Sequence, residues 1–195
     1  MKRKGLIILI VVVAVVLLLF SWFKSTYNNM VVRQETVSAQ LGNLQTQYQR
    51  RADLIPNLVA TVKGYAAHEQ STLEQVTEAR AKATQTQLNV NDAAALSQYM
   101  EAQGELSSAL SRLMAISENY PDLKANQNFL DLQTQLEGTE NRISVERRKY
   151  NEAARDFNVY IKMFPRNLVS GLFGFQQSPY FEAQSGAETA PTVQF

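Results

Sequence analysis

Few side chains in this sequence belong to the types that carry out covalent or metal chemistry. The 195 residues contain no cysteine, which excludes thiol nucleophiles, disulfides and thiolate metal sites. The one histidine, His68, precedes Glu69, but no second histidine completes the H-E-x-x-H zinc motif. The G-x-S-x-G motif of serine hydrolases and a glycine-rich phosphate loop are also missing. We therefore expect His68 to be a solvated helix residue, and we expect no metal, no cofactor and no enzymatic activity.

Two charged residues, Arg51 and Glu146, interrupt apolar stripes that otherwise indicate helix packing faces. We interpret them as a polar pair that sets the register between two long helices. The alternative is a proton or ligand site. A buried pair contributes little net stability, but loss of one partner costs about 3–5 kcal/mol, so either role predicts sensitivity to mutation.

Two further groups stand where a helix is expected to bend or stop: Asp53, Pro56 and Asn57, and Tyr120, Pro121 and Asp122. In the first group, Asp53 is expected to cap a segment that restarts after a kink. The alternative is a bent site with exposed backbone groups. The second group is expected to form the turn of a helical hairpin, with partner recognition as the alternative.

The elements that must position these residues begin with an apolar run at residues 6–23. Its length of about 18 uncharged residues is at the threshold for a helix that spans a bilayer. Trp22 and Phe23 at its end are typical of the membrane interface. The length of the run favours an uncleaved anchor, with a removed signal peptide as the alternative.

The basic residues predict the orientation of this anchor. Lys2, Arg3 and Lys4 precede the run, whereas Lys24 and Arg33 are the only nearby basic residues after it. The positive-inside rule then predicts a cytoplasmic N-terminus and an extracytoplasmic location for the rest of the chain.

From Val37 to Val76, apolar residues recur at alternating steps of four and three, the pattern of a helix in a left-handed bundle. Pro56 lies off this stripe and predicts either one long helix bent near residues 53–56 or two helices that meet there. Residues 84–91 are expected to form a turn, after which Asn91 or Asp92 caps a second helix.

The second helix is expected to carry Leu96 to Leu113 on its apolar face, followed by a loop at residues 117–122. A third helix, capped by Asn126, is expected to continue to Phe164 and to end at Pro165. The predicted fold is all-α, with one N-terminal transmembrane helix and an antiparallel three- to four-helix bundle of long coiled-coil-like helices. The predicted segments are a basic terminus (1–5), the anchor (6–23), the bundle (24–167), an aromatic segment (168–181) and a disordered tail (182–195).

The aromatic segment is the best candidate for an interaction surface. Its large apolar residues are Leu168, Val169, Leu172, Phe173 and Phe175. They are too few to form a second span, but they can lie on the membrane interface, pack against the anchor or bind a neighbouring protomer. The alternative is that they cap the open end of the bundle core.

Several motifs are specific enough to suggest a family. Residues 51–58, RADLIPNL, resemble the R-x-D-L-I-P-N-L motif of the LemA family, and residues 118–126, ENYPDLKAN, are similar to its E-x-Y-P-D-L-K-x-N motif. Residues 139–143, 150–151 and 164–165 are similar to later motifs in the same order, so the resemblance extends over roughly residues 27–181. It implies a bacterial membrane protein with one N-terminal span and a helical bundle, and it brings no catalytic residues. Some descriptions of the family place the short N-terminus outside the cell, against the charge pattern here.

These observations predict a non-enzymatic, membrane-anchored scaffold of the bacterial cell envelope that self-associates. The anchor is expected in the cytoplasmic membrane, with the bundle on the periplasmic side. One alternative is an adaptor or regulatory subunit for a membrane protease or phosphatase in envelope stress, and another is an unrecognised hydrolase. With a net charge of +1, no nucleic-acid partner is expected. The expected partners are the lipid bilayer and further copies of the chain.

Overall fold

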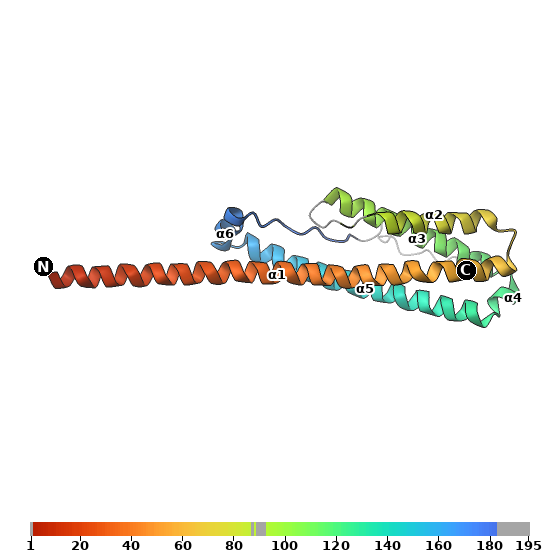
Figure 1. Ribbon diagram of the computed structural model, residues 1–195, viewed down its shortest axis with the longest axis horizontal. Coiled ribbons are helices and arrows are strands. Elements are labelled where there is room, and N and C mark those ends of the chain that lie inside the picture. Colours follow the sequence, from red (N-terminus) through yellow and green to blue (C-terminus); the bar gives the residue numbers. More distant parts are fainter. Residues whose placement is uncertain (1, 87, 89–92, 183–195) are drawn as a thin grey trace, which may run out of the picture. The chain divides into compact units, whose positions relative to one another are not determined.

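The computed structural model describes residues 2–86, 88 and 93–182 and contains only helices within them. The six helices are α1 (Lys2–Tyr65), α2 (Gln70–Gln85), α3 (Ala93–Ser117), α4 (Pro121–Lys124), α5 (Gln127–Lys162) and α6 (Arg166–Phe173). Figure 1 traces them along the chain. The prediction of an all-α fold with a long apolar N-terminal helix is confirmed.

The chain divides into two compact units, and both boundaries fall inside long helices. The first unit comprises Met1–Ala39 and Glu152–Ser178, and the second comprises Gln40–Asn151 and Pro179–Phe195. Both α1 and α5 therefore contribute residues to each unit. The boundaries predicted at residues 24, 168 and 182 stay predictions, and residues 183–195 of the expected disordered tail lie outside the described residues.

α1 contains both the expected anchor and the first bundle helix without a break. Residues 3–22 are all exposed, as expected for a helix that faces lipid, and α1 is long and apolar enough to cross a membrane. The helix continues through Pro56, so the alternative of two helices meeting there is wrong. The expected continuation to Val76 is also wrong, because α1 ends at Tyr65 and α2 begins only at Gln70.

The hydrophobic core of the second unit is built by one face of each helix that enters it. Figure 1 shows α2 and α3 as an antiparallel hairpin in this unit. Its most buried apolar side chains are Ile55, Leu58 and Val62 on α1, Val76 on α2, Leu106 and Leu113 on α3, Leu123 on α4 and Phe129 on α5. Most of these positions belong to the predicted apolar stripes. Full burial of such a side chain contributes roughly 1.5–3 kcal/mol, so the stripes account for the packing of this unit.

The cap predicted for the last long helix is confirmed. The Phe129 N–H donates to Asn126 Oδ1 at 3.0 Å, which satisfies one of the amide groups that a helix start leaves without a partner. The cap predicted at Asn91 or Asp92 lies outside the described residues. The loop predicted at residues 117–122 is shorter than expected, because Pro121 starts α4 as its first residue.

Candidate functional site

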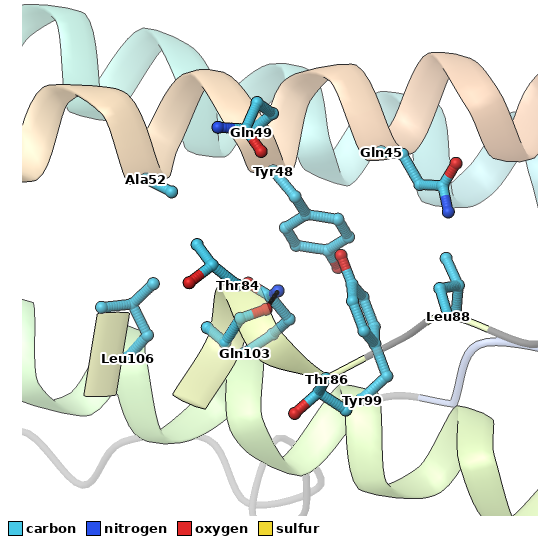
Figure 2. Close-up of a pocket in the computed structure, with 11 residues that line it drawn as sticks. Gln45, Tyr48, Gln49, Ala52, Thr84, Thr86, Leu88, Tyr99, Gln103 and Leu106 are labelled. Carbon is cyan, nitrogen blue, oxygen red and sulfur yellow. Dashed lines mark hydrogen bonds between the residues drawn. The ribbon is translucent and has the colours of Figure 1, made fainter. Parts of the chain in front are cut away.

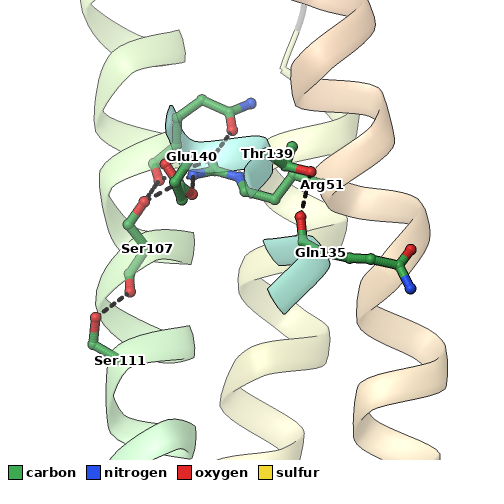
Figure 3. Close-up of polar contacts among 7 residues, drawn as sticks. Arg51, Ser107, Ser111, Gln135, Thr139 and Glu140 are labelled. Carbon is green, nitrogen blue, oxygen red and sulfur yellow. Dashed lines mark hydrogen bonds and ion pairs between the residues drawn. The ribbon is translucent and has the colours of Figure 1, made fainter. Parts of the chain in front are cut away.

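The most deeply buried charge in the second unit is the guanidinium of Arg51. The residue is 1% exposed, and it forms an ion pair with Glu140 on α5. Its Nη1 also donates to Ser107 Oγ on α3 at 2.9 Å, and its Nη2 donates to the side-chain oxygen of Gln103. Figure 3 shows Arg51 reaching both α3 and α5. One side chain thus joins three helices through charge-assisted hydrogen bonds.

The partner predicted for Arg51 is wrong. Glu146 pairs with Lys149 on its own helix, with Nζ and Oε1 2.8 Å apart. The stripe on α5 has Thr139 at the level of Arg51, and the Thr139 hydroxyl donates to the Gln135 carbonyl at 2.7 Å. The long arginine side chain passes beyond the stripe to Glu140, whose side chain is 45% exposed. In the sequence, the position of Glu140 within the motif at residues 139–143 could have identified it as the partner of Arg51.

The motif around Pro56 lies inside α1 rather than at a helix end. The Asp53 carboxylate accepts a hydrogen bond from Gln49 Nε2 at 2.8 Å, one turn earlier, so its predicted capping role is wrong. Asn57 contributes its carbonyl to the Thr61 hydroxyl at 2.8 Å. The Ala52 carbonyl accepts a hydrogen bond from Arg80 Nε on α2 at 2.7 Å. This segment therefore fastens α1 to α2.

The motif around Tyr120 closes the end of the bundle at which α1 meets α2 and α3 meets α5. The Tyr120 hydroxyl donates to Glu69 Oε1 at 3.0 Å, and this bond raises the pKa of the Tyr120 phenol. Asn126 Nδ2 donates to the Tyr65 hydroxyl at 2.9 Å. Pro121 and Asp122 are exposed in the first turn of α4. The hydrogen bonds of this motif are those expected of the predicted hairpin turn. Because Pro121 and Asp122 are exposed, partner recognition by this motif stays a prediction.

A cavity of about 400 Å³ lies beside Arg51, and the sequence did not reveal it. Figure 2 shows Tyr48 on α1 and Tyr99 on α3 pointing toward one another within it. Their rings lie edge to face with centroids 5.4 Å apart, and burial raises the pKa of both phenols. Among the residues that the structure describes, its lining contains hydroxyls, amides and apolar groups but no carboxylate, amine or imidazole. The described lining therefore offers hydrogen bonds to a ligand.

The remaining candidates for chemistry do not cluster. His68 is exposed in the turn between α1 and α2. Among residues 2–86, 88 and 93–182, no three carboxylate or imidazole side chains converge as a group that could hold a metal ion.

Side chains near the end of α5 hold the extended segment that follows α6 through hydrogen bonds that the sequence did not predict. In the second unit, the Asn151 amide donates to and accepts from the backbone of Phe181 at 2.8 and 2.9 Å. In the first unit, Asn158 does the same for Ser178, with both bonds at 2.8 Å. The Tyr150 hydroxyl donates to the Pro179 carbonyl at 3.0 Å. Side-chain amides of α5 thus replace the neighbouring strand that an extended segment would otherwise need.

In the first unit, the aromatic segment packs against the base of the anchor. The Phe173 ring lies 5.7 Å from the ring of Phe23 and 4.7 Å from that of Tyr27, measured between centroids. Phe175 lies 5.7 Å from Tyr27 and 6.4 Å from Phe157 on α5. Aromatic pairs at these distances contribute about 0.5–1.5 kcal/mol each beyond the burial of their area.

The five residues of the predicted interaction segment separate into two sets. Val169 is buried, Phe173 contacts Phe23 at the end of the anchor and Phe175 contacts Tyr27 just after it. Leu168 and Leu172 are exposed and make none of these ring contacts, whereas Phe173 stays partly exposed despite its contact. Trp22 and Phe23 occupy the last turn of the apolar run, and their place at the membrane interface stays a prediction. Phe164 was expected on the apolar face of the last long helix, but it lies beyond the end of α5 and is exposed.

Comparison with known proteins agrees with these motifs. The family model described as the LemA family matches residues 40–195. Magnetosome protein MamQ 2 of Paramagnetospirillum magneticum is 29% identical over 182 residues, covering 84% of this chain and 67% of the relative. Protein LemA of Metamycoplasma hominis is 25% identical over 156 residues, covering 80% of this chain and 68% of the relative. Neither name denotes an enzyme. Since the family model covers well over half of the sequence, this chain belongs to the LemA family.

Proposed function

We propose that this protein is a non-enzymatic scaffold of the bacterial cell envelope, anchored in the cytoplasmic membrane by α1 and self-associating there. The observation that carries the proposal is the continuity of α1, which contains an apolar run at residues 6–23, exposed as far as residue 22, and the buried positions of the bundle. A helix of this kind ties a folded bundle to a bilayer without a linker. LemA-family membership and relatives of the same kind support a membrane-associated role.

The use of the polar residues supports a structural role rather than catalysis. Arg51, Arg80 and Asn126 each join one helix to another, and each bonds to groups within the chain. The described residues that line the cavity beside Tyr48 carry no charge. A hydrolase would need a nucleophile and a base close together. The described lining of this cavity supplies no histidine, carboxylate or lysine, and where a hydroxyl and a carboxylate do lie close together, at Ser107 and Glu140, both bond to Arg51.

Self-association in the membrane is supported by the tether itself. Confinement to two dimensions raises the effective concentration of every tethered copy, so weak lateral contacts can suffice. The test uses full-length protein with Ser71, an exposed residue of α2, changed to cysteine and labelled with donor or acceptor dyes. In phosphatidylcholine vesicles, energy transfer should persist on dilution with lipid and fall when unlabelled protein is added. Transfer that falls in proportion to the protein-to-lipid ratio would contradict self-association.

The same variant tests the proposed orientation, with the N-terminus in the cytoplasm and the bundle outside it. A membrane-impermeant maleimide should label Ser71→Cys in intact spheroplasts. Labelling of the full-length protein that requires lysis would place the bundle in the cytoplasm. A second variant, Ser38→Cys, which is exposed on α1, guards against local protection at residue 71.

A further inference from the structure

The short helix α6 carries an apolar face that the chain itself leaves uncovered. Leu168 and Leu172 are four residues apart on one side of the helix and are 65% and 72% exposed. The next positions round the helix, Val169 and Ser170, are buried at 2% and 7%. Asn167 and Gly171 occupy a third side, which is polar or small and exposed. α6 thus has two apolar sides, one packed inward and one facing outward, in addition to its polar side.

Local hydrogen bonds hold α6 in this position. The Ser170 hydroxyl donates to the Ile161 carbonyl near the end of α5 at 3.0 Å. Gly174 ends the helix in the left-handed conformation with a φ of 72°, and the Phe175 N–H donates to the Ser170 carbonyl at 3.0 Å. A glycine is favoured at this position because side chains with a Cβ are strained there. The orientation of the exposed leucines is therefore set by the fold of the first unit.

The depth of α6 in the bilayer follows from the proposed anchoring by α1, on which this inference rests. Residues 6–23, at about 1.5 Å per residue, span about 27 Å, close to the roughly 30 Å of a bilayer's hydrocarbon core. Phe23 ends this run, and the Phe173 ring of α6 packs on Phe23 and Tyr27. Aromatic residues at such a boundary lie among the lipid headgroups. The contact with Phe173 therefore brings α6 to the surface layer of the leaflet in which the anchor ends.

We propose that α6 is an interfacial helix that inserts Leu168 and Leu172 into the headgroup and upper acyl layer of this leaflet. Phe164, 81% exposed just before the helix, adds to the same contact. Amphipathic helices of this kind lie in the plane of the interface with the apolar face buried by about 5–10 Å. The occupant of the exposed face is lipid rather than a second copy, because the anchor already holds the helix at the bilayer. The protein then has two membrane contacts, one that spans and one that rests on the surface.

The absence of native cysteine makes this proposal directly testable. Full-length variants Leu168→Cys, Leu172→Cys and Asn167→Cys each carry one thiol for an environment-sensitive dye. Because all three positions are exposed, labelling there leaves the packed face of α6 untouched. The proteins are placed in phosphatidylcholine nanodiscs, and quenching by a lipid-attached spin label is compared with quenching by aqueous iodide.

The proposal predicts that the lipid quencher acts several-fold more strongly at residues 168 and 172 than at residue 167, with the reverse order for iodide. Equal quenching of all three sites by iodide, with little quenching by lipid, would overturn it. Nanodiscs prepared with a large excess of empty discs contain single copies and provide the second measurement. Residues 168 and 172 that are shielded from both quenchers in discs with several copies, and are quenched only in single-copy discs, would also overturn the proposal, because the face would then be covered by another copy. This outcome is independent of whether the protein self-associates elsewhere.

Discussion

The side chain of Arg80 donates from Nε to the carbonyl oxygen of Ala52 at 2.7 Å. In an α-helix, the Ala52 carbonyl would accept from the N–H of residue 56, but Pro56 has none. Arg80 on α2 therefore supplies the donor that the proline removes from α1. This relationship explains how a helix can continue through a proline and why the neighbouring helix lies against it at this level.

A double-mutant cycle tests this relationship. Arg80→Ala should cost about 1–3 kcal/mol of unfolding free energy, because the Ala52 carbonyl is left buried without a donor. In a Pro56→Ala background, which restores the N–H of residue 56, the same change should cost clearly less. Arg112→Ala, at an exposed arginine of α3, is the control for loss of charge. Chemical unfolding of the full-length protein, followed by circular dichroism, measures all four variants, and equal costs in both backgrounds would contradict the account.

The two glutamates considered as partners of the buried arginine should differ in how much their loss lowers the unfolding free energy. Glu140→Gln leaves the guanidinium of Arg51 buried without a counter-charge and should cost about 3 kcal/mol, near the lower end for a broken buried pair. Glu146→Gln breaks only a pair with Lys149 three residues away and should cost under about 1 kcal/mol. Unfolding free energies of the two variants give the comparison. A larger loss for Glu146→Gln would instead support the pairing predicted from the apolar stripes.

Asn126 has two separable roles at the closed end of the bundle. Asn126→Ala should cost about 0.5–2 kcal/mol, because it removes the cap of α5 and the bond to Tyr65. Asn126→Ser keeps a capping oxygen and loses the amide donor, so its cost should be smaller. Asn128→Ala, at the exposed second residue of α5, serves as the control. Thermal unfolding checks the order, and a serine variant as damaged as the alanine variant would argue against a capping role.

The stability of the protein should fall at alkaline pH. Burial raises the pKa of Tyr150 to about 12, whereas the unfolded residue titrates near 10. Between these values the folded chain binds more protons than the unfolded chain, so stability is complete below pH 10 and is lost as the pH rises toward 12. Tyr150→Phe should be less stable at neutral pH, because it loses the bond to the Pro179 carbonyl. Its stability should then fall less steeply from pH 10 to 12, and an unchanged slope would contradict the assignment.

The helical architecture was predictable because it rests on local patterns. The apolar run at residues 6–23, the stripe from Val37 onward and the cap at Asn126 each depend on a few neighbouring residues. The break between α1 and α2 was missed because sequence rules treat proline as the stronger helix-breaking signal, so the break was expected at Pro56. The break follows Gly64 and is held by the bonds of Tyr65 and Glu69 to residues more than fifty positions away.

The polar site around Arg51 was predicted only in part, because an arginine side chain is long enough to reach residues beside the opposite stripe. Arg51 was recognised because a charge on an apolar stripe is exceptional, but its partner was sought on the opposite stripe. A long, flexible arginine side chain can bond to residues beside that stripe, such as Glu140 and Ser107. The bonds of Asn151 and Asn158 to the later extended segment are contacts between distant parts of the chain, and no local pattern reports them.

We propose that this LemA-family protein works as a self-associating membrane scaffold. The most direct test extracts the full-length protein from membranes into native nanodiscs and measures the mass of the particles by mass photometry, with electron microscopy of the same sample. The account predicts a discrete homo-oligomer that persists when the discs are diluted. Particles with the mass of a single copy in one disc, at every expression level, would contradict self-association and would favour an adaptor that holds a different envelope protein.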